Sequence, residues 1–259
     1  MGSKRLRQSE ILKLLEKVPG LTCNSLAEKL DVTSMTIRRD LNDLSSKGYV
    51  SVVQGVAILN RNIDGSTIST EYSLANERMK QTEAKQKIGK AAATLLKSGD
   101  IILIDTGTTT EQVLNYLPID LPLTIVGYNM NTLLAVKDRE YTELIFGGGF
   151  YRRNTQFFES QENATLLMRL GITKYFGSAA GISTKGAVSC VEQYEYNAKS
   201  NALAVATKKY LLIDSSKFGK IRPCIFGDIK DYDLIITDSD ISQQWINFLK
   251  KANIKYLLA

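Results

Sequence analysis

The first fifty residues show the spacing of apolar side chains that is typical of three short amphipathic helices. Between residues 4 and 18, apolar positions recur at helical intervals among charged ones, and Pro19-Gly20 ends this pattern. Thr22 has the side chain of a helix N-cap, so a second helix is expected to follow it. A third helix is predicted to begin near Ser34 and to end near Ser46.

A β-hairpin and a linker are predicted to follow these helices. The apolar runs 49–53 and 56–59 are separated by a glycine-containing turn, and Gly48 before them ends the third helix. Residues 60–74 are mostly polar, which suits a linker better than a core element. The sequence therefore predicts a first domain over residues 1–59 and a linker over 60–74.

The remaining chain, residues 75–259, alternates between short β-branched runs and helical patterns. Helices are expected at about 75–97, 109–117, 130–136, 161–170, 193–206 and 242–252, and strands at 101–105, 123–126, 144–146, 175–178, 210–214, 234–237 and 256–258. Such alternation is typical of a largely parallel sheet with helices on both faces. The predicted fold class is α/β, with a small helical domain in front of a larger α/β domain.

Composition narrows the possible functions. Of the 259 residues 44% are hydrophobic, which is enough for a sizeable core, and the formal net charge of +6 favours an anionic partner. We find neither a signal peptide nor an apolar run long enough to span a bilayer, so we expect a cytoplasmic protein without a membrane partner. The three cysteines show no zinc-ligand spacing and the chain has no histidine, which excludes Ser-His and Cys-His triads. No catalytic residue, metal or cofactor is expected.

The third predicted helix has two different faces. Ile37, Leu41 and Leu44 fall on one side, as core residues would. The other side and its flanks carry Ser34, Met35, Thr36, Arg38, Arg39 and Asn42. Arg can bind guanine edges, Asn can bind adenine edges, and Ser or Thr can hold a phosphate, so this face suits the major groove of DNA. The alternative is an ordinary solvated helix face, as found in three-helix domains that bind nothing.

These residues lie within a longer pattern. Arg7, Ile11 and Leu15, followed by Thr33 and by Thr36-Ile37-Arg38-Arg39-Asp40-Leu41, resemble the helix-turn-helix signature of the DeoR family of bacterial transcription regulators. The resemblance implies a winged helix-turn-helix in which Ser34, Met35, Thr36, Arg38 and Arg39 contact the operator while Asp40 is structural. Residues 51–54 depart from the family's basic wing because they carry no charge, which implies a weaker phosphate contact there.

A second candidate site follows the strand predicted at 101–105. Thr106-Gly107-Thr108-Thr109-Thr110 leads into a helix, so backbone N–H groups, the helix dipole and several hydroxyls could hold a phosphate dianion. Lys217, in Asp214-Ser215-Ser216-Lys217, follows another predicted strand and would lie at the same edge of the sheet. The alternatives are a threonine-rich helix cap without a ligand and a surface lysine in a turn.

The second domain resembles the sensor domains of the same family, which share the ribose-5-phosphate isomerase superfold. The matching positions are Gly107-Thr108-Thr109-Thr110, Asn129, Gly147-Gly148, the Gly181-Ile182-Ser183 turn, Glu195 with Lys199, and Asp214 with Lys217. The resemblance implies a ligand site in which the threonines and Lys217 hold the phosphate, while the sugar lies near Asp105, Asn129, Glu195 and Lys199, with Gly107 and Gly148 in the surrounding loops. Glu195 and Lys199 are four residues apart, so a plain helix-surface ion pair is the alternative.

Taken together, the resemblances imply a homo-oligomeric repressor, dimer or tetramer, of a carbohydrate or nucleoside catabolic operon. A phosphorylated sugar would release it from double-stranded operator DNA. Ser178-Ala179-Ala180-Gly181 is most similar to a branch of the family for which deoxyribose-5-phosphate is the implied effector. One alternative effector is a hexose phosphate such as fructose-1-phosphate or tagatose-6-phosphate. Another alternative is a sugar-phosphate isomerase fused to a DNA-binding head, but Ala180 stands where most relatives carry Asp, so binding without turnover is expected.

Overall fold

The chain divides into two compact units, residues 1–71 and 72–259. The computed structural model describes residues 2–18, 20–46, 49–53, 55–59 and 74–259. Residues 60–73 of the predicted linker lie outside the described residues, as do Pro19, Gly48 and Gln54 of the predicted turns. Leu74, the last residue assigned to the linker from the sequence, is the first residue of helix α4 (Leu74–Arg78).

The N-terminal unit contains the predicted three helices and hairpin, together with one short strand that the sequence did not predict. Its elements are α1 (Gly2–Lys17), β1 (Leu21–Thr22), α2 (Cys23–Lys29), α3 (Ser34–Ser46), β2 (Val50–Val53) and β3 (Val56–Leu59). The Thr22 hydroxyl accepts a hydrogen bond from the Ser25 N–H at 3.2 Å, which caps α2 as predicted. β3 pairs antiparallel with both β2 and β1, so β1 completes a three-stranded sheet.

One apolar core joins the three helices of this unit. Ile11 and Leu15 of α1, Leu26 of α2, and Ile37 and Leu41 of α3 are almost fully buried against one another. Burial of each such side chain stabilises the fold by about 1.5–3 kcal/mol. The predicted inner face of the third helix is confirmed, and its opposite face is therefore held outward by packing.

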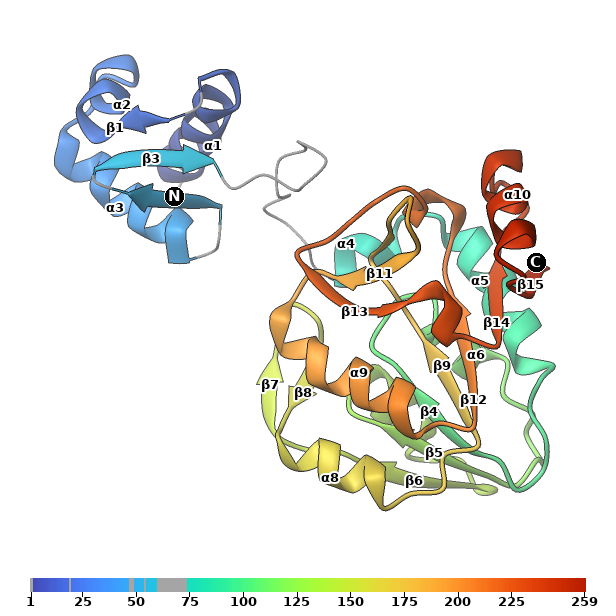
Figure 1. The fold of residues 1–259 in the computed structure, drawn as a ribbon. Helices are drawn as coiled ribbons and strands as arrows, with labels where there is room; N and C mark the ends of the chain where they lie inside the picture. Colours follow the sequence, from blue (N-terminus) through green and yellow to red (C-terminus); the bar gives the residue numbers. More distant parts are fainter. Residues whose placement is uncertain (1, 19, 47–48, 54, 60–73) are drawn as a thin grey trace. The chain divides into compact units, whose positions relative to one another are not determined.

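The second unit is built on a seven-stranded sheet in which every neighbouring pair is parallel (Figure 1). In spatial order the strands are β15 (Tyr256–Leu258), β14 (Leu234–Thr237), β12 (Lys208–Leu212), β9 (Lys174–Gly177), β4 (Ile101–Ile104), β5 (Leu123–Gly127) and β6 (Thr142–Phe146). The α/β class and the parallel sheet predicted from the alternating pattern are confirmed.

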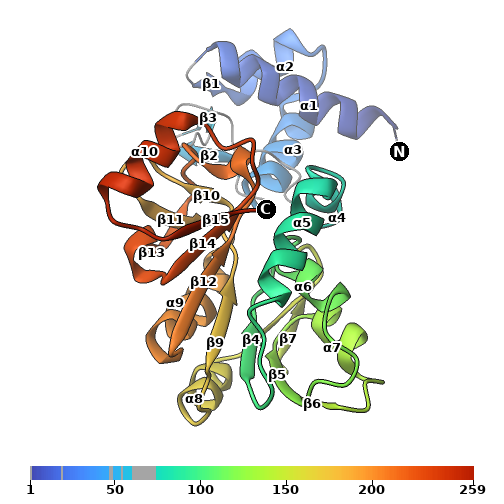
Figure 2. The same ribbon diagram turned by 90° about the vertical axis from the view of Figure 1, so that its right-hand side faces the viewer.

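Helices cover the sheet on both faces, as Figure 2 shows. One face packs against α5 (Thr82–Ala93), α6 (Glu111–Asn115) and α7 (Met130–Val136), and the other against α8 (Glu162–Met168), α9 (Tyr196–Val205) and α10 (Gln243–Lys251). In β4, Ile102 and Ile104 enter the first of these layers while Leu103 enters the second. A strand buried on both sides in this way has the continuous apolar sequence from which it was predicted.

Three predicted helices have different bounds in the structure. The helix expected at 75–97 is two helices, α4 and α5, because the chain turns between them and Gln81 adopts a left-handed backbone conformation with φ of 51°. The helix expected at 109–117 is only α6, since Thr109 and Thr110 still belong to the turn that precedes it. The helix expected at 193–206 begins with the 3-10 turn η1 (Gln193–Glu195).

Two small antiparallel sheets escaped prediction. β10 (Gly181–Ile182), β11 (Ala187–Cys190) and β13 (Cys224–Asp228) form one, and β7 (Phe150–Arg152) with β8 (Phe157–Glu159) forms the other. The turn predicted at Gly181-Ile182-Ser183 is wrong in its first two residues, which are strand β10. These strands are too short, and too broken by glycine, to show a regular alternation. No helix among the described residues is both long and apolar enough to cross a membrane.

Candidate functional sites

The outward face of α3 presents the residues predicted to contact DNA. Arg38, Arg39 and Asn42 are exposed, and Met35 is 60% exposed. Ser34 and Thr36 are partly buried at the start of the helix, where the Thr33 hydroxyl accepts a hydrogen bond from the Thr36 N–H at 3.3 Å. The arrangement leaves guanidinium and amide groups free of the core, as a recognition helix requires.

Asp40 lies on the inner side of the same helix. Its side chain is buried, and its Oδ2 accepts a hydrogen bond from Nε of Arg7 at 2.5 Å. This ion pair ties α3 to α1, so Asp40 is structural, as the family resemblance implied, and Arg7 is occupied within the unit. Because the pair is held among apolar side chains, removal of either charge would leave the other poorly solvated.

The second site lies where the sheet changes direction. The chain runs outward from β4 through β5 to β6, and then returns to place β9 on the opposite side of β4. Connections therefore leave the carboxyl ends of β4 and β9 in opposite directions, which opens a crevice at this point of a parallel sheet. Asp105 follows β4 directly and Ser178 follows β9 directly, so both side chains stand at this crevice.

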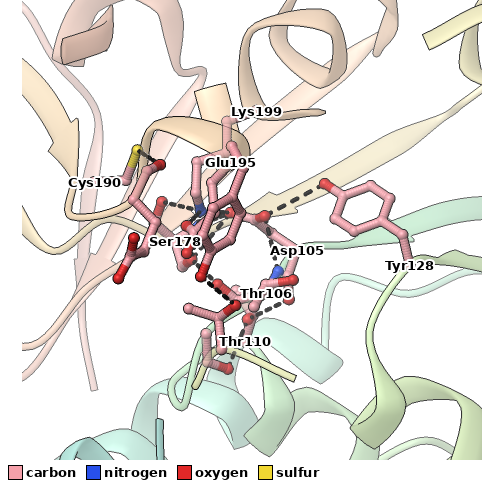
Figure 3. A network of polar contacts seen from close by, with 12 residues as sticks. Asp105, Thr106, Thr110, Tyr128, Ser178, Cys190, Glu195 and Lys199 are labelled. Carbon is pink, nitrogen blue, oxygen red and sulfur yellow. Dashed lines mark hydrogen bonds and ion pairs between the residues drawn. The ribbon is translucent and has the colours of Figure 1, made fainter. Parts of the chain in front are cut away.

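A dense hydrogen-bond network surrounds the buried carboxylate of Asp105 (Figure 3). Oδ1 accepts from the Thr106 N–H at 2.8 Å and from the Tyr128 hydroxyl at 3.3 Å. Oδ2 accepts from the Ser178 N–H at 2.9 Å and from Nζ of Lys199 at 2.6 Å. Because both carboxylate oxygens accept hydrogen bonds from the protein, Asp105 holds the surrounding residues in position. It does not line the cavity, where a ligand contact was predicted.

Lys199 and Glu195 form a buried charged group with Asp105. Nζ of Lys199 lies 3.5 Å from Glu195 Oε2, and both side chains are almost fully buried, so the predicted alternative of a surface ion pair is wrong. Burial alone would lower the pKa of Lys199, but the charges of Asp105 and Glu195 raise it above its usual value. Burial raises the pKa of Glu195 to about 7; the Asp105 carboxylate acts in the same direction and Lys199 opposes it.

The hydroxyl groups of the threonine-rich turn have different surroundings. Thr110 is fully buried and donates to the carbonyl oxygens of Asp105 and Gly107 at 2.9 and 3.0 Å, so its hydroxyl holds the turn together. Thr106 is buried too, but its Oγ1 has no hydrogen-bond partner among the described residues. Gly107 is required by packing, because a Cβ there would lie 2.6 Å from Cβ and Oγ of Ser178.

A small enclosed cavity lies against this turn. It is lined by Glu77, Thr106, Gly107, Thr108, Thr109, Ser178, Ala179, Ala180, Cys190, Glu195, Lys199 and Lys217. The space open to water centres is about 20 Å³, which is room for about one water molecule. The structure therefore brings Gly107, Thr108, Thr109, Glu195, Lys199 and Lys217 together as predicted, in a closed arrangement.

An acidic side chain from α4, Glu77, also lines this cavity. Lys217, on the 3-10 turn η2 (Ser215–Lys217), forms an ion pair with Oε2 of Glu77, whose Oε1 binds Nζ of Lys80 at 2.9 Å. Burial alone would raise the pKa of Glu77, but the hydrogen bonds from Lys217 and Lys80 lower it to about 2. Glu77 was not predicted as a site residue, because it lies far from the turn in the chain and within a helical pattern.

Two predicted ligand residues lie away from the cavity. Asn129 caps α7, accepting from the Thr132 N–H at 2.9 Å, and its buried Nδ2 is unpaired among the described residues. Gly148 is exposed, and its carbonyl accepts from Asn163 Nδ2 at 3.3 Å. Neither borders the space between Thr108 and Lys217. Ser178, by contrast, was not predicted as a site residue. It is the polar last residue of the strand predicted at 175–178, and that position at a carboxyl end of the sheet is the signal that could have identified it.

The helix-turn-helix unit and the α/β unit together define a two-domain DNA-binding regulator. Residues 7–62 match the DeoR-like helix-turn-helix domain, and residues 80–239 match the DeoR C terminal sensor domain. The chain therefore belongs to the DeoR family of transcription regulators, and the resemblance noted in its sequence is confirmed.

Curated relatives match the chain over nearly its whole length. It is 29% identical over 251 residues to the deoxyribose operon repressor of Escherichia coli (strain K12), covering 97% of each protein. It is 30% identical over 239 residues to a lactose phosphotransferase system repressor of Staphylococcus epidermidis, covering 90% of this chain and 92% of that protein. Among solved structures it is similar to ribose 5-phosphate isomerase A from Methanocaldococcus jannaschii, with 17% identity, a TM-score of 0.39, and coverage of 53% of this chain and 54% of that one.

Proposed function

We propose that this protein represses a sugar or nucleoside catabolic operon and leaves its operator when a phosphorylated sugar enters the cavity beside Lys217. The observation that carries this proposal is a charged cavity at the switch point of the sheet, in a chain whose other unit exposes Arg38, Arg39 and Asn42 on a helix-turn-helix. As a DNA-binding regulator it would act in the cytoplasm, as a homo-oligomer on repeated half-sites.

The chemistry of the cavity suits a phosphate ester. Lys217 supplies a positive charge, while Thr106, Thr108 and Thr109 supply hydroxyls along one wall. Phosphate oxygens accept several charge-assisted hydrogen bonds at once, which such a wall can donate. Glu195 and Lys199, which also line the cavity, can bind sugar hydroxyls, because a carboxyl group accepts and an ammonium group donates.

Deoxyribose-5-phosphate is our first candidate effector, because the Escherichia coli relative of 29% identity is named a deoxyribose operon repressor. A hexose phosphate remains the alternative, since other relatives of similar identity carry names from other sugar systems, such as the lactose phosphotransferase system repressor. The residues that line the cavity suit a pentose phosphate and a hexose phosphate equally, so they support a sugar phosphate as the class of effector.

A thermal-shift screen of the full chain against pentose and hexose phosphates tests this proposal. A ligand that binds only the folded protein raises the melting temperature by mass action, by about 2.7 kcal/mol of stability at a concentration 100-fold above its dissociation constant. We expect one phosphate ester to raise the melting temperature and its unphosphorylated sugar to leave it unchanged. If no phosphate ester changed the melting temperature, the proposed sensor function would be wrong.

An isomerase activity is the second candidate, and Glu195 is the residue that favours it. A carboxyl group with a pKa of about 7 beside the cavity could move a proton between adjacent carbons of a sugar. The repressor names of the relatives and the neutral Ala180 in the cavity wall support binding without turnover. Incubation of candidate aldose phosphates with the protein in D₂O, followed by NMR at the sugar's second carbon, would detect the exchange that an isomerase must catalyse.

A further inference from the structure

An anion supplied by the chain itself already lies at the effector cavity and is bound to Lys217. The Glu77 carboxylate borders the cavity and has its two oxygens bound by different lysines, Oε1 by Lys80 at 2.9 Å and Oε2 by Lys217. The Glu77 side chain is only 12% exposed. Lys217, the one lysine at this end expected to hold the effector's phosphate, is therefore not free.

The cavity offers more hydrogen-bonding capacity than the Glu77 carboxylate uses. Thr106 is 5% exposed and lines the cavity, yet its Oγ1 has no partner among the residues that the structure describes. A buried hydroxyl without a partner destabilises the folded protein unless a ligand or water satisfies it. A phosphate group has three terminal oxygens where a carboxylate has two, and thus could bind Lys217 and still reach Thr106.

Size also requires movement at this end of the cavity. The space of about 20 Å³ open to water centres in this cavity fits about one water molecule, whereas a sugar phosphate is many times larger. The carboxylate and a phosphate dianion would repel each other if both lay against Lys217. Entry of the phosphate beside Lys217 therefore demands that Glu77 withdraw.

Glu77 belongs to a short helix that is held by polar contacts and by the buried side chain of Leu74. α4 has five residues, too few to be stable in isolation. Its carbonyl at Glu77 accepts from the buried Nζ of Lys85 at 2.5 Å, and Arg78 pairs with Glu111 at 2.9 Å. Leu74, the first residue of α4, follows residue 73 directly, so the helix is the first described element after the segment that leads back to the DNA-binding unit.

We propose that Glu77 is an internal competitor for the effector's phosphate: the phosphate takes Lys217, the carboxylate is displaced, and α4 is released from the cavity. The inference rests on the proposed function and adds its regulation. Release of α4 would take place in the first described element that follows residues 60–73. The two effects are thermodynamically linked. The Glu77–Lys217 ion pair weakens phosphate binding by a certain factor, and bound phosphate weakens the ion pair by the same factor.

The variant Glu77→Gln keeps the shape of the side chain and removes its charge. We expect the full-length variant to bind both deoxyribose-5-phosphate and inorganic phosphate about tenfold more tightly than the wild type in calorimetric titrations, which corresponds to about 1.4 kcal/mol. Glu83→Gln is the matched control, because the Glu83 side chain is 84% exposed and pairs with Lys87 on the surface of α5. It should bind like the wild type. Equal or weaker binding by Glu77→Gln would overturn the inference.

Hydrogen exchange on the wild-type protein tests the displacement without any substitution. Amides in residues 74–80 should exchange faster when deoxyribose-5-phosphate is bound, because α4 has left the cavity. Unchanged or slower exchange in a protein that binds the ester would refute the displacement and leave the sensor function intact. If the wild type binds no ester but Glu77→Gln binds inorganic phosphate, the competitor is supported and the proposed effector is wrong. If neither protein binds any phosphate, both proposals fail.

Discussion

The buried carboxyl group of Glu195 should make the stability of the sensor unit depend on pH. Burial raises the pKa of Glu195 from 4.5 to about 7, even though Nζ of Lys199 lies 3.5 Å away. Because the folded-state pKa is higher than the unfolded one, the folded protein binds the proton more tightly. The resulting stabilisation is complete below pH 4.5 and is lost as the pH rises through 7.

The size of the effect follows from these two pKa values. With 4.5 in the unfolded chain and about 7 in the folded one, protonation of Glu195 adds about 1.4 kcal/mol of stability at pH 6 and almost none at pH 8. For a unit the size of residues 72–259, 1 kcal/mol shifts the melting temperature by about 2–4 °C. The pH-dependent part should therefore amount to about 3–6 °C between pH 8 and pH 6.

Glu195→Gln isolates this contribution, because glutamine is neutral at both pH values and leaves Lys199 paired with Asp105. The melting temperatures of the wild type and the variant are measured by calorimetry at pH 8 and at pH 6. The wild-type-minus-variant difference is then compared between the two pH values, so that the contributions of all other titrating groups cancel. We expect the wild type to gain about 3–6 °C relative to Glu195→Gln on going to pH 6. The same wild-type-minus-variant difference at both pH values would refute the buried-carboxyl account.

Three further substitutions have separate expected results. Arg39→Ala should weaken operator binding by about 1–3 kcal/mol in a fluorescence anisotropy titration without changing the melting temperature, and equal affinity would remove Arg39 from the DNA interface. Asp40→Asn should instead lower the melting temperature, because it leaves Arg7 without its buried partner, and a stable variant would contradict the structural role. Lys217→Met should weaken sugar-phosphate binding at least tenfold in a calorimetric titration, because a charged hydrogen bond contributes about 1.5–3 kcal/mol; unchanged affinity would place the phosphate elsewhere.

The sequence predicted those parts of the fold that have a regular period. β4 is a continuous apolar run because it is buried on both faces, and α3 shows its core face in the spacing of Ile37, Leu41 and Leu44. The break between α4 and α5 was missed, because the interrupting Gln81 is a residue that normally favours a helix. The sheet of β10, β11 and β13 was missed because its pairings depend on tertiary contacts between short segments.

The candidate site was predictable where its residues follow strands. Asp105, the threonine-rich turn and Lys217 stand after apolar runs whose carboxyl ends meet in a parallel sheet, so their proximity followed from topology. The role of each side chain at the site could not be predicted from topology. The Thr110 hydroxyl stabilises the turn, and hydrogen-bond donors surround the Asp105 carboxylate. Glu77 could not be found from the sequence, because only tertiary packing brings α4 against Lys217.

The measurement that tests the central claim most directly is a titration of the operator complex with a sugar phosphate. The full chain would be bound to a labelled operator fragment and titrated with deoxyribose-5-phosphate, with hexose phosphates, and with deoxyribose as the uncharged control. Coupling between the cavity and α3 predicts that one phosphate ester releases the DNA while deoxyribose does not. DNA that stays bound at saturating concentrations of every ester, in a protein shown to bind one of them, would contradict the account.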